Sequence, residues 1–225
     1  MFQKYTWIEL NVIRARDFRP ESYHPYNWSK VVVEPKPKKT DWNARRNIVF
    51  KNNRVFTNIQ EVITRAKTEK TSLAIFKPTR ILDVIIEETE RDWNAKSLAY
   101  LKQASRQLSL FGTQEEIAKT FEIVHKLPYR FSYVFEDDTG KRSKLLIEDW
   151  EIGMLYFNCL KHACGDEKIA TSKVKDKYLN ILTKRDLHFF LGTTLRHHYQ
   201  AKNPFIIIGV FYPPALISSQ LALDI

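Results

Sequence analysis

The sequence predicts an α+β fold in which several helices pack on a mixed, largely antiparallel sheet. Segments with strand and helix patterns follow one another without the regular strand–helix–strand rhythm of a doubly wound protein. Hydrophobic residues make up 44% of the 225 residues and aromatic residues 13%, which is enough for a buried core. The chain has 6 glycines and no glycine-rich phosphate loop, which argues against a nucleotide-dependent motor or a Rossmann enzyme.

The first half of the chain begins with a strand pattern and continues into a proline-rich stretch. Residues 5–12 alternate between apolar and polar side chains, which predicts a strand. Four prolines between residues 14 and 46 exclude a long helix and predict an extended arm or a long loop. The elements expected next are a hairpin over residues 47–56 that turns at Asn52–Asn53, a helix that begins at Asn58, strands over 72–76 and 80–87, and a helix over 93–105.

The second half carries the clearest hairpin, formed by residues 121–137 and 144–148 around the turn 138–141. Two helices are expected over 149–163 and 167–183. The apolar runs 188–191 and 205–211 are typical of central, buried strands. The chain is expected to divide into a basic region over 1–112, with the proline-rich arm, and an α+β region over 113–225, or to form one continuous domain.

Positive charge is concentrated near the start of the chain. Lysine and arginine number 36 against 26 acidic residues, a formal charge of +10, which favours DNA, RNA or another polyanionic partner. Residues 1–60 contain 12 basic and 5 acidic side chains, a surplus of seven. The side chains expected to bind nucleic acid are Lys36, Lys38, Lys39, Trp42, Arg45 and Arg46, with Tyr23, Tyr26 and Trp28 as further stacking faces. The alternative is a solvated loop whose aromatic rings fold back onto the core.

The sequence gives no indication of a membrane segment or a metal cluster. No stretch approaches eighteen apolar residues and the first residues lack a signal-peptide pattern, so we expect a cytoplasmic protein without a membrane partner. The two cysteines, Cys159 and Cys164, flank His162, but a structural zinc site needs four ligands. Idle or buried thiols are therefore the expected state.

Acidic residues around the hairpin offer one candidate for catalysis. Glu148 and Asp149, with Lys144 nearby, have the residue types with which a nuclease holds Mg²⁺ against a scissile phosphate. Their spacing departs from the usual nuclease pattern. Asp137–Asp138 also fits a turn, and Asp149 fits the N-cap of a helix.

Two other groups of polar residues are weaker candidates. His188, His197 and His198 have the chemistry of a general acid and base, or of simple phosphate contacts. Asp83, Glu87 and Glu88 form another acidic group, but strand alternation would place some of them on opposite faces.

The most specific motif is the peptide Gln107, Leu108, Ser109, Leu110 and Phe111. It resembles the peptide with which bacterial proteins dock onto the replication sliding clamp. In such a peptide the glutamine amide fixes the register and the leucine and phenylalanine side chains bury apolar surface. A looser copy occupies residues 220–225. The alternative is the end of an amphipathic helix whose apolar side chains face the core.

These observations together predict a nucleic-acid-binding accessory protein that is recruited to the sliding clamp. Its work would concern DNA replication, DNA repair, or a mobile or defence element that exploits replication. One alternative is a metal-dependent nuclease that uses Mg²⁺. The other is a non-catalytic subunit of a nucleoprotein complex in antiviral defence, in which the apolar peptides contact other subunits.

Overall fold

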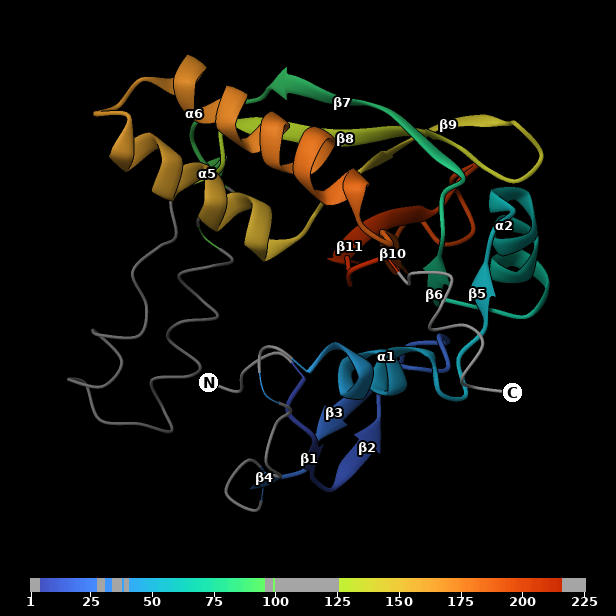
Figure 1. Ribbon diagram of the computed structural model, residues 1–225. Coiled ribbons are helices and arrows are strands. Elements are labelled where there is room, and N and C mark those ends of the chain that lie inside the picture. Colours follow the sequence, from blue (N-terminus) through green and yellow to red (C-terminus); the bar gives the residue numbers. More distant parts are fainter. Residues whose placement is uncertain are drawn as a thin grey trace. The chain divides into compact units, whose positions relative to one another are not determined.

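The computed structural model describes residues 5–27, 31–33, 38, 41–95, 99 and 126–215. The chain divides into two compact units, one made of residues 1–85 and 132–225 and the other of residues 86–131. Helices and mostly antiparallel sheets are both present, so the predicted α+β class is confirmed (Figure 1). Within the described residues, no helix has the length and apolar character that spanning a membrane requires.

The first unit is built on a four-stranded sheet with the order β11–β10–β6–β5. Its strands are β5 (Val55–Phe56), β6 (Leu73–Phe76), β10 (His188–Thr193) and β11 (Phe205–Phe211). Only the β5–β6 pair is parallel. The two apolar runs predicted as strands are therefore confirmed, and β10 lies inside the sheet between β11 and β6.

A second sheet has the order β7–β8–β9 and contains the predicted hairpin. Its strands are β7 (Arg80–Glu88), β8 (Tyr129–Glu136) and β9 (Arg142–Leu146), with β8 and β9 antiparallel. The turn between β8 and β9 contains Gly140 with φ of 77°, a left-handed conformation that suits glycine. Ile147, just after β9, bridges to Ile207 on β11 and so connects the two sheets.

The core of the first unit is an aromatic cluster shared by both sheets. Phe76, Tyr133, Phe135 and Phe189 have no exposed surface. The ring centroids of Tyr133 and Phe189 lie 5.0 Å apart, and those of Phe76 and Phe135 lie 5.3 Å apart. Rings at these separations contribute attraction beyond the area that they bury. The cluster therefore holds β6, β8 and β10 together.

Each α-helix whose bounds the structure describes begins directly after a residue whose side chain accepts N–H groups of the first turn. In α2 (Ile59–Thr68) the Asn58 side chain accepts the N–H groups of Gln60 and Glu61, and the predicted apolar face is buried. The helix α5 (Trp150–His162) is capped by Asp149. The next helix, α6 (Glu167–Lys175), lies beside α5 and continues as a π-helical turn, Asp176–Ile181, and a 3₁₀ turn, Leu182–Lys184 (Figure 1). The two helices predicted here are thus confirmed.

The N-terminal region differs from the prediction. The hairpin over residues 47–56 is wrong, because residues 42–50 form the helix α1 (Trp42–Phe50), whose first turn is capped by the Asp41 side chain 2.9 Å from the Ala44 nitrogen. Asn52, with φ of 65°, turns the chain from α1 toward β5 without a strand pair.

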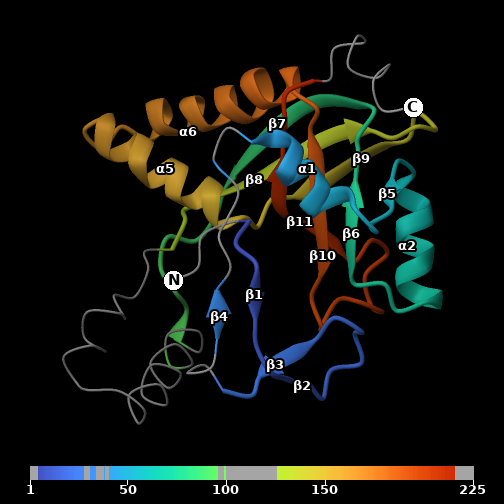
Figure 2. The ribbon, with the colours of Figure 1, turned by 60° about the horizontal axis from the view of Figure 1, so that its bottom comes forward.

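The expected arm is partly folded into two ribbons (Figure 2). In one, β1 (Ile8–Glu9) pairs with β4 (Val32–Val33). In the other, β2 (Val12–Arg14) pairs with β3 (Tyr23–Pro25). The single strand expected over 5–12 is thus replaced by two short strands. Most of the helix expected over 93–105, and the expected boundary at 112–113, lie outside the described residues, so both stay predictions.

Candidate nucleic-acid interface

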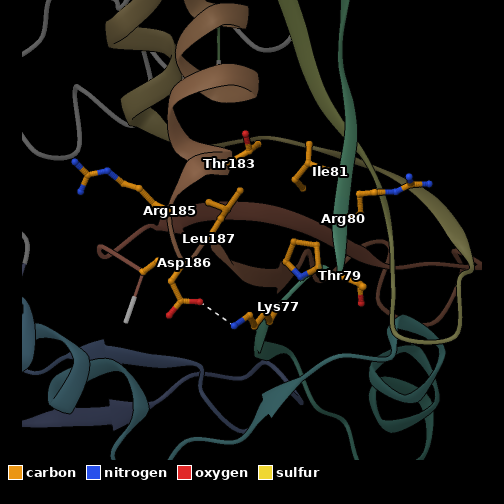
Figure 3. Close-up of a pocket in the computed structure, with 10 residues that line it drawn as sticks. Lys77, Thr79, Arg80, Ile81, Thr183, Arg185, Asp186 and Leu187 are labelled. Atoms are coloured by element: carbon orange, nitrogen blue, oxygen red, sulfur yellow. Dashed lines mark ion pairs between the residues drawn. The ribbon is translucent and has the colours of Figure 1, made fainter. Parts of the chain in front are cut away.

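A cavity of about 670 Å³ opens on the first unit where three chain segments meet. Residues 77–81, which comprise the connection after β6 and the first two residues of β7, form one wall. Four residues between Thr183 and Leu187, before β10, form the opposite wall, and Ala215 completes the lining. The turns at the ends of the strands therefore supply the side chains of this pocket, which we call the basic pocket (Figure 3).

The basic pocket is cationic at its edges. Lys77, Arg80 and Arg185 line it, and Asp186 is the one carboxylate of the lining. Figure 3 shows Arg80 and Arg185 extending to opposite sides, with Lys77 directed at Asp186. Arg80 also pairs with Glu136 on β8 at 2.9 Å, but its side chain is 66% exposed, and such pairs in water hold their cation weakly. The arrangement favours an anionic ligand that crosses the pocket from edge to edge.

Asp186 is shared by two cations. Its carboxylate lies 2.9 Å from the Lys77 ammonium and 2.9 Å from the Arg46 guanidinium of α1. Burial opposes ionisation of Asp186, but Lys77, His188 and Arg46 together outweigh it and hold the pKa of the carboxyl below its usual value. Arg46 also donates to the Pro214 carbonyl oxygen at 2.6 Å. In the absence of a ligand, Asp186 therefore neutralises part of the charge of the pocket.

The histidines do not form a common acid–base group. His188 is buried behind Asp186, with Nδ1 2.9 Å from the Asp186 carbonyl oxygen, and burial lowers its pKa. His198 is fully buried, and its ring nitrogens lie 2.8 Å from the Thr193 hydroxyl and 2.8 Å from the Ala66 carbonyl oxygen. With both nitrogens engaged by the protein, His198 stabilises the fold. His197 is exposed.

Three of the residues expected to bind nucleic acid lie on α1, beside the basic pocket. Arg46 reaches Asp186, and the Trp42 ring lies 6.0 Å from the Arg185 guanidinium. The Arg45 guanidinium lies 4.9 Å from the Trp42 ring and 4.8 Å from the Tyr5 ring. Since its ring also lies near Phe211 and Tyr212, Trp42 folds back onto the protein, as the alternative interpretation of the arm proposed.

The other arm residues have varied surroundings. Lys38 is exposed, as are Tyr23 and Tyr26, with 51% and 73% of their surface accessible. The described residues do not include Lys36, Lys39 and Trp28, so their predicted role stays a prediction.

The acidic residues proposed for catalysis are placed at the end of β9 and the start of α5. Lys144 lies on β9 opposite Val134, and the exposed Glu148 donates its backbone N–H to Ile207 at 2.8 Å. Asp149 caps α5 by accepting the Glu151 N–H at 2.9 Å. Among the described residues, no three His, Cys, Asp or Glu side chains are placed to hold a metal ion. Catalysis by this group stays a prediction.

Other acids near the hairpin stabilise the fold. The buried Asp137 carboxylate accepts N–H groups from Thr139 and Lys141, both at 3.0 Å, and from Ile59 at 3.2 Å. Burial opposes its ionisation, yet these hydrogen bonds outweigh burial and lower its pKa. Asp83 pairs with Lys175 at 2.8 Å, which lowers the pKa of Asp83. The turn assignment of Asp137 therefore agrees with its hydrogen bonds.

Sequence reasoning missed the residues that make the pocket. In the predicted element order, Lys77 lies in the connection between two strands, and Arg185 and Asp186 follow the end of a helix. None of the three residues belongs to a recognisable motif. The sequence marked the site only by a lysine and an arginine near the ends of predicted strands. The clamp-like peptide at 107–111 and its copy at 220–225 lie outside the described residues.

Comparison with known proteins places the chain in a family without assigning a function. Residues 55–224 match the model of a domain of unknown function (DUF8757), and residues 1–51 match that of a second domain of unknown function (DUF8758). No curated protein and no solved structure matches the chain. Because the first match covers most of its length, the chain belongs to the family described as domain of unknown function DUF8757.

Proposed function

We propose that this protein binds nucleic acid through the phosphate backbone at the basic pocket. The observation that carries the proposal is the lining itself, in which three cations, Lys77, Arg80 and Arg185, accompany the single carboxylate of Asp186. Arg46 adds a further cation from α1 through its contact with Asp186. Lysine and arginine bind phosphates and release counterions, which is the main source of affinity in non-specific nucleic-acid binding.

The placement of the cations suits a chain of phosphates better than one compact anion. Arg80 and Arg185 extend to opposite sides of the pocket (Figure 3), so a backbone that crosses it meets a cation at each edge. Both side chains are exposed, and each loses little on exchanging water or a surface partner for phosphate. The ligand is DNA or RNA, since phosphate contacts do not distinguish them.

Arg80→Ala and Arg185→Ala test the proposal in fluorescence anisotropy titrations with a labelled oligonucleotide at several salt concentrations. Each lost contact should make the slope of log K against log salt shallower by about 0.7 for a single strand or about 0.9 for B-DNA. Arg196→Ala, which removes an exposed arginine in the loop after β10, is the matched control. An unchanged affinity and slope in both pocket variants would remove the pocket from the binding surface.

Recruitment to the sliding clamp is the second part of the proposal, and it rests on the sequence of residues 107–111. In this view the protein works in the cytoplasm on DNA replication, DNA repair, or a mobile or defence element that uses the replication machinery. Replacing Gln107, Leu110 and Phe111 by alanine should abolish retention on immobilised clamp, while Gln114→Ala should leave it unchanged. Absence of retention for the unmodified protein would end this part of the proposal and leave the nucleic-acid part standing.

A further inference from the structure

The floor of the basic pocket is apolar, which phosphate binding alone does not require. Pro78, Ile81 and Leu187 belong to the lining, and Pro78 and Leu187 are buried. In Figure 3, Ile81 and Leu187 lie in the middle of the pocket, between Arg185 on one side and Arg80 on the other. Apolar floors with a few polar groups at the edge are the usual surroundings of a small organic group, such as a base and its sugar.

The size of the pocket limits what can enter it. A volume of about 670 Å³ falls in the range of roughly 300–1,000 Å³ that is typical of pockets for small organic ligands. One nucleotide is of this size, whereas a duplex as a whole is far wider. A paired base would first have to leave its stack, at a cost of a few kcal/mol. An unpaired base enters without most of that cost.

Polar groups are present where a seated nucleotide would need them. The Thr183 hydroxyl donates to the Leu179 carbonyl oxygen, which leaves lone pairs on the hydroxyl oxygen to accept a hydrogen bond. The Asp186 carboxylate and the Lys77 ammonium, which lie next to each other, supply a hydrogen-bond acceptor and a donor. The phosphates before and after the seated nucleotide would then face the arginines at the two edges.

We infer that the basic pocket seats one unpaired nucleotide, with its base on Pro78, Ile81 and Leu187, and that the protein prefers single-stranded to double-stranded nucleic acid. This inference rests on the proposed function and deepens it by naming the class of ligand. The apolar floor provides the preference, and the cations at the edges provide affinity for both classes of strand.

Three probes test the inference with the full chain: a thymidine homopolymer, the same strand annealed to its complement, and an abasic strand of equal length. At equal salt the homopolymer should bind about tenfold more tightly than either of the others, which corresponds to about 1.4 kcal/mol. If none of the three probes binds, the proposed function itself is refuted. Equal affinity for all three refutes only the inference.

A substitution in the pocket tests whether the pocket is the source of the preference for strands that carry bases. Ala215 is exposed and lines the pocket, so Ala215→Leu narrows it without replacing a core side chain, and Ala215→Ser is the matched control. Ala215→Leu should reduce the preference for the homopolymer over the abasic strand to less than about threefold, with an unchanged salt slope, because the edge cations remain. A preference that persists in Ala215→Leu would place the base elsewhere and overturn the inference. Thermal unfolding of both variants confirms that they fold.

Discussion

Replacing Asp186 by asparagine should strengthen nucleic-acid binding and weaken the fold at the same time. The carboxylate of Asp186 neutralises Lys77 and Arg46, each at 2.9 Å, in the absence of a ligand. A phosphate that enters the basic pocket has to compete with it for these two cations. Asparagine keeps the shape of the side chain but removes its charge, so the competition weakens.

The size of both effects follows from the surroundings of Asp186. Removing one negative charge about 4 Å from a bound phosphate relieves a repulsion of about 1 kcal/mol in water, or roughly fivefold in affinity. One more phosphate neutralised steepens the salt slope by about 0.7 for a single strand. The side chains of Arg46 and Asp186 are only 13% and 16% exposed, so losing their charged hydrogen bond should cost about 1.5–3 kcal/mol of stability. Lys77 is half exposed and adds little.

The stability effect also depends on pH. The pKa of Asp186 is lower in the folded protein than in the unfolded chain, where it is about 3.9. Its contribution to the free energy of unfolding is therefore present above that value and is lost as the pH falls through the lower folded pKa. Asp186→Asn should lack this part of the acid dependence, so that variant and unmodified protein should converge in stability at low pH.

Anisotropy titrations and denaturant unfolding of Asp186→Asn measure the two effects separately. Asp176→Asn, which changes an exposed carboxylate on the π-helical turn, is the control for net charge. Weaker binding by Asp186→Asn would refute the competition, because it would mean that Asp186 holds Lys77 and Arg46 in their binding positions. Unchanged stability would contradict the importance of the pair with Arg46.

Four further substitutions test the fold by denaturant unfolding. Asp137→Ala should cost about 2–4 kcal/mol, because its buried carboxylate accepts three N–H groups and one hydroxyl, and a loss below about 1 kcal/mol would contradict this role. Gly140→Ala should destabilise the protein by roughly 1–2 kcal/mol, because Gly140 has φ of 77°. Gly153→Ala, inside α5 with open space around the added carbon, should stabilise it by about 1 kcal/mol. A change of the same sign in both variants would be inconsistent with the backbone argument. Tyr133→Phe should cost about 1 kcal/mol through the lost hydrogen bond to the Tyr178 carbonyl oxygen, and an unchanged free energy of unfolding would contradict a contribution of this bond to stability.

The elements predicted correctly from the sequence are those in which the pattern of apolar residues matches the pattern of burial. In α2 the apolar residues recur at helical spacing behind an asparagine cap, and all four are buried. In β10 and β11 the apolar runs are continuous because both faces of these strands are covered over most of their length. Periodicity and capping are local properties, so one sequence is sufficient to detect them.

The helix α1 escaped prediction because its stability comes from distant residues. Val49 is its one buried residue, and Arg45 and Arg46 interrupt any apolar stripe. Its side chains find partners far along the chain: Arg46 pairs with Asp186, 140 residues away, and Trp42 packs near Phe211. The Asn52–Asn53 pair was a local signal for a turn, and it was correct for the turn but not for strands on both sides of it.

The same separation in sequence explains why the charge pattern of the sequence did not indicate the position of the basic pocket. The surplus of cations in residues 1–60 predicted a polyanionic partner. Of the expected residues that the structure describes, none lines the pocket, and Arg46 and Trp42 reach it through Asp186 and Arg185. Lys77, Arg80 and Arg185 come from the region after residue 60, outside the stretch that carries this surplus. Their convergence depends on how β6, β7 and β10 are joined, which composition does not encode.

All residues that line the pocket lie in the second matched region, and the first region reaches it through the contact between Arg46 and Asp186. Arg46 belongs to residues 1–51, and Asp186, Lys77 and Arg185 belong to residues 55–224. Asp186 pairs with both Arg46 and Lys77. Without the first region, Lys77 would be the one described cation at hydrogen-bond distance from the Asp186 carboxylate. The negative charge that Arg46 now neutralises would then act directly at the pocket. A DUF8757 region without its N-terminal partner should then bind nucleic acid more weakly than the whole chain.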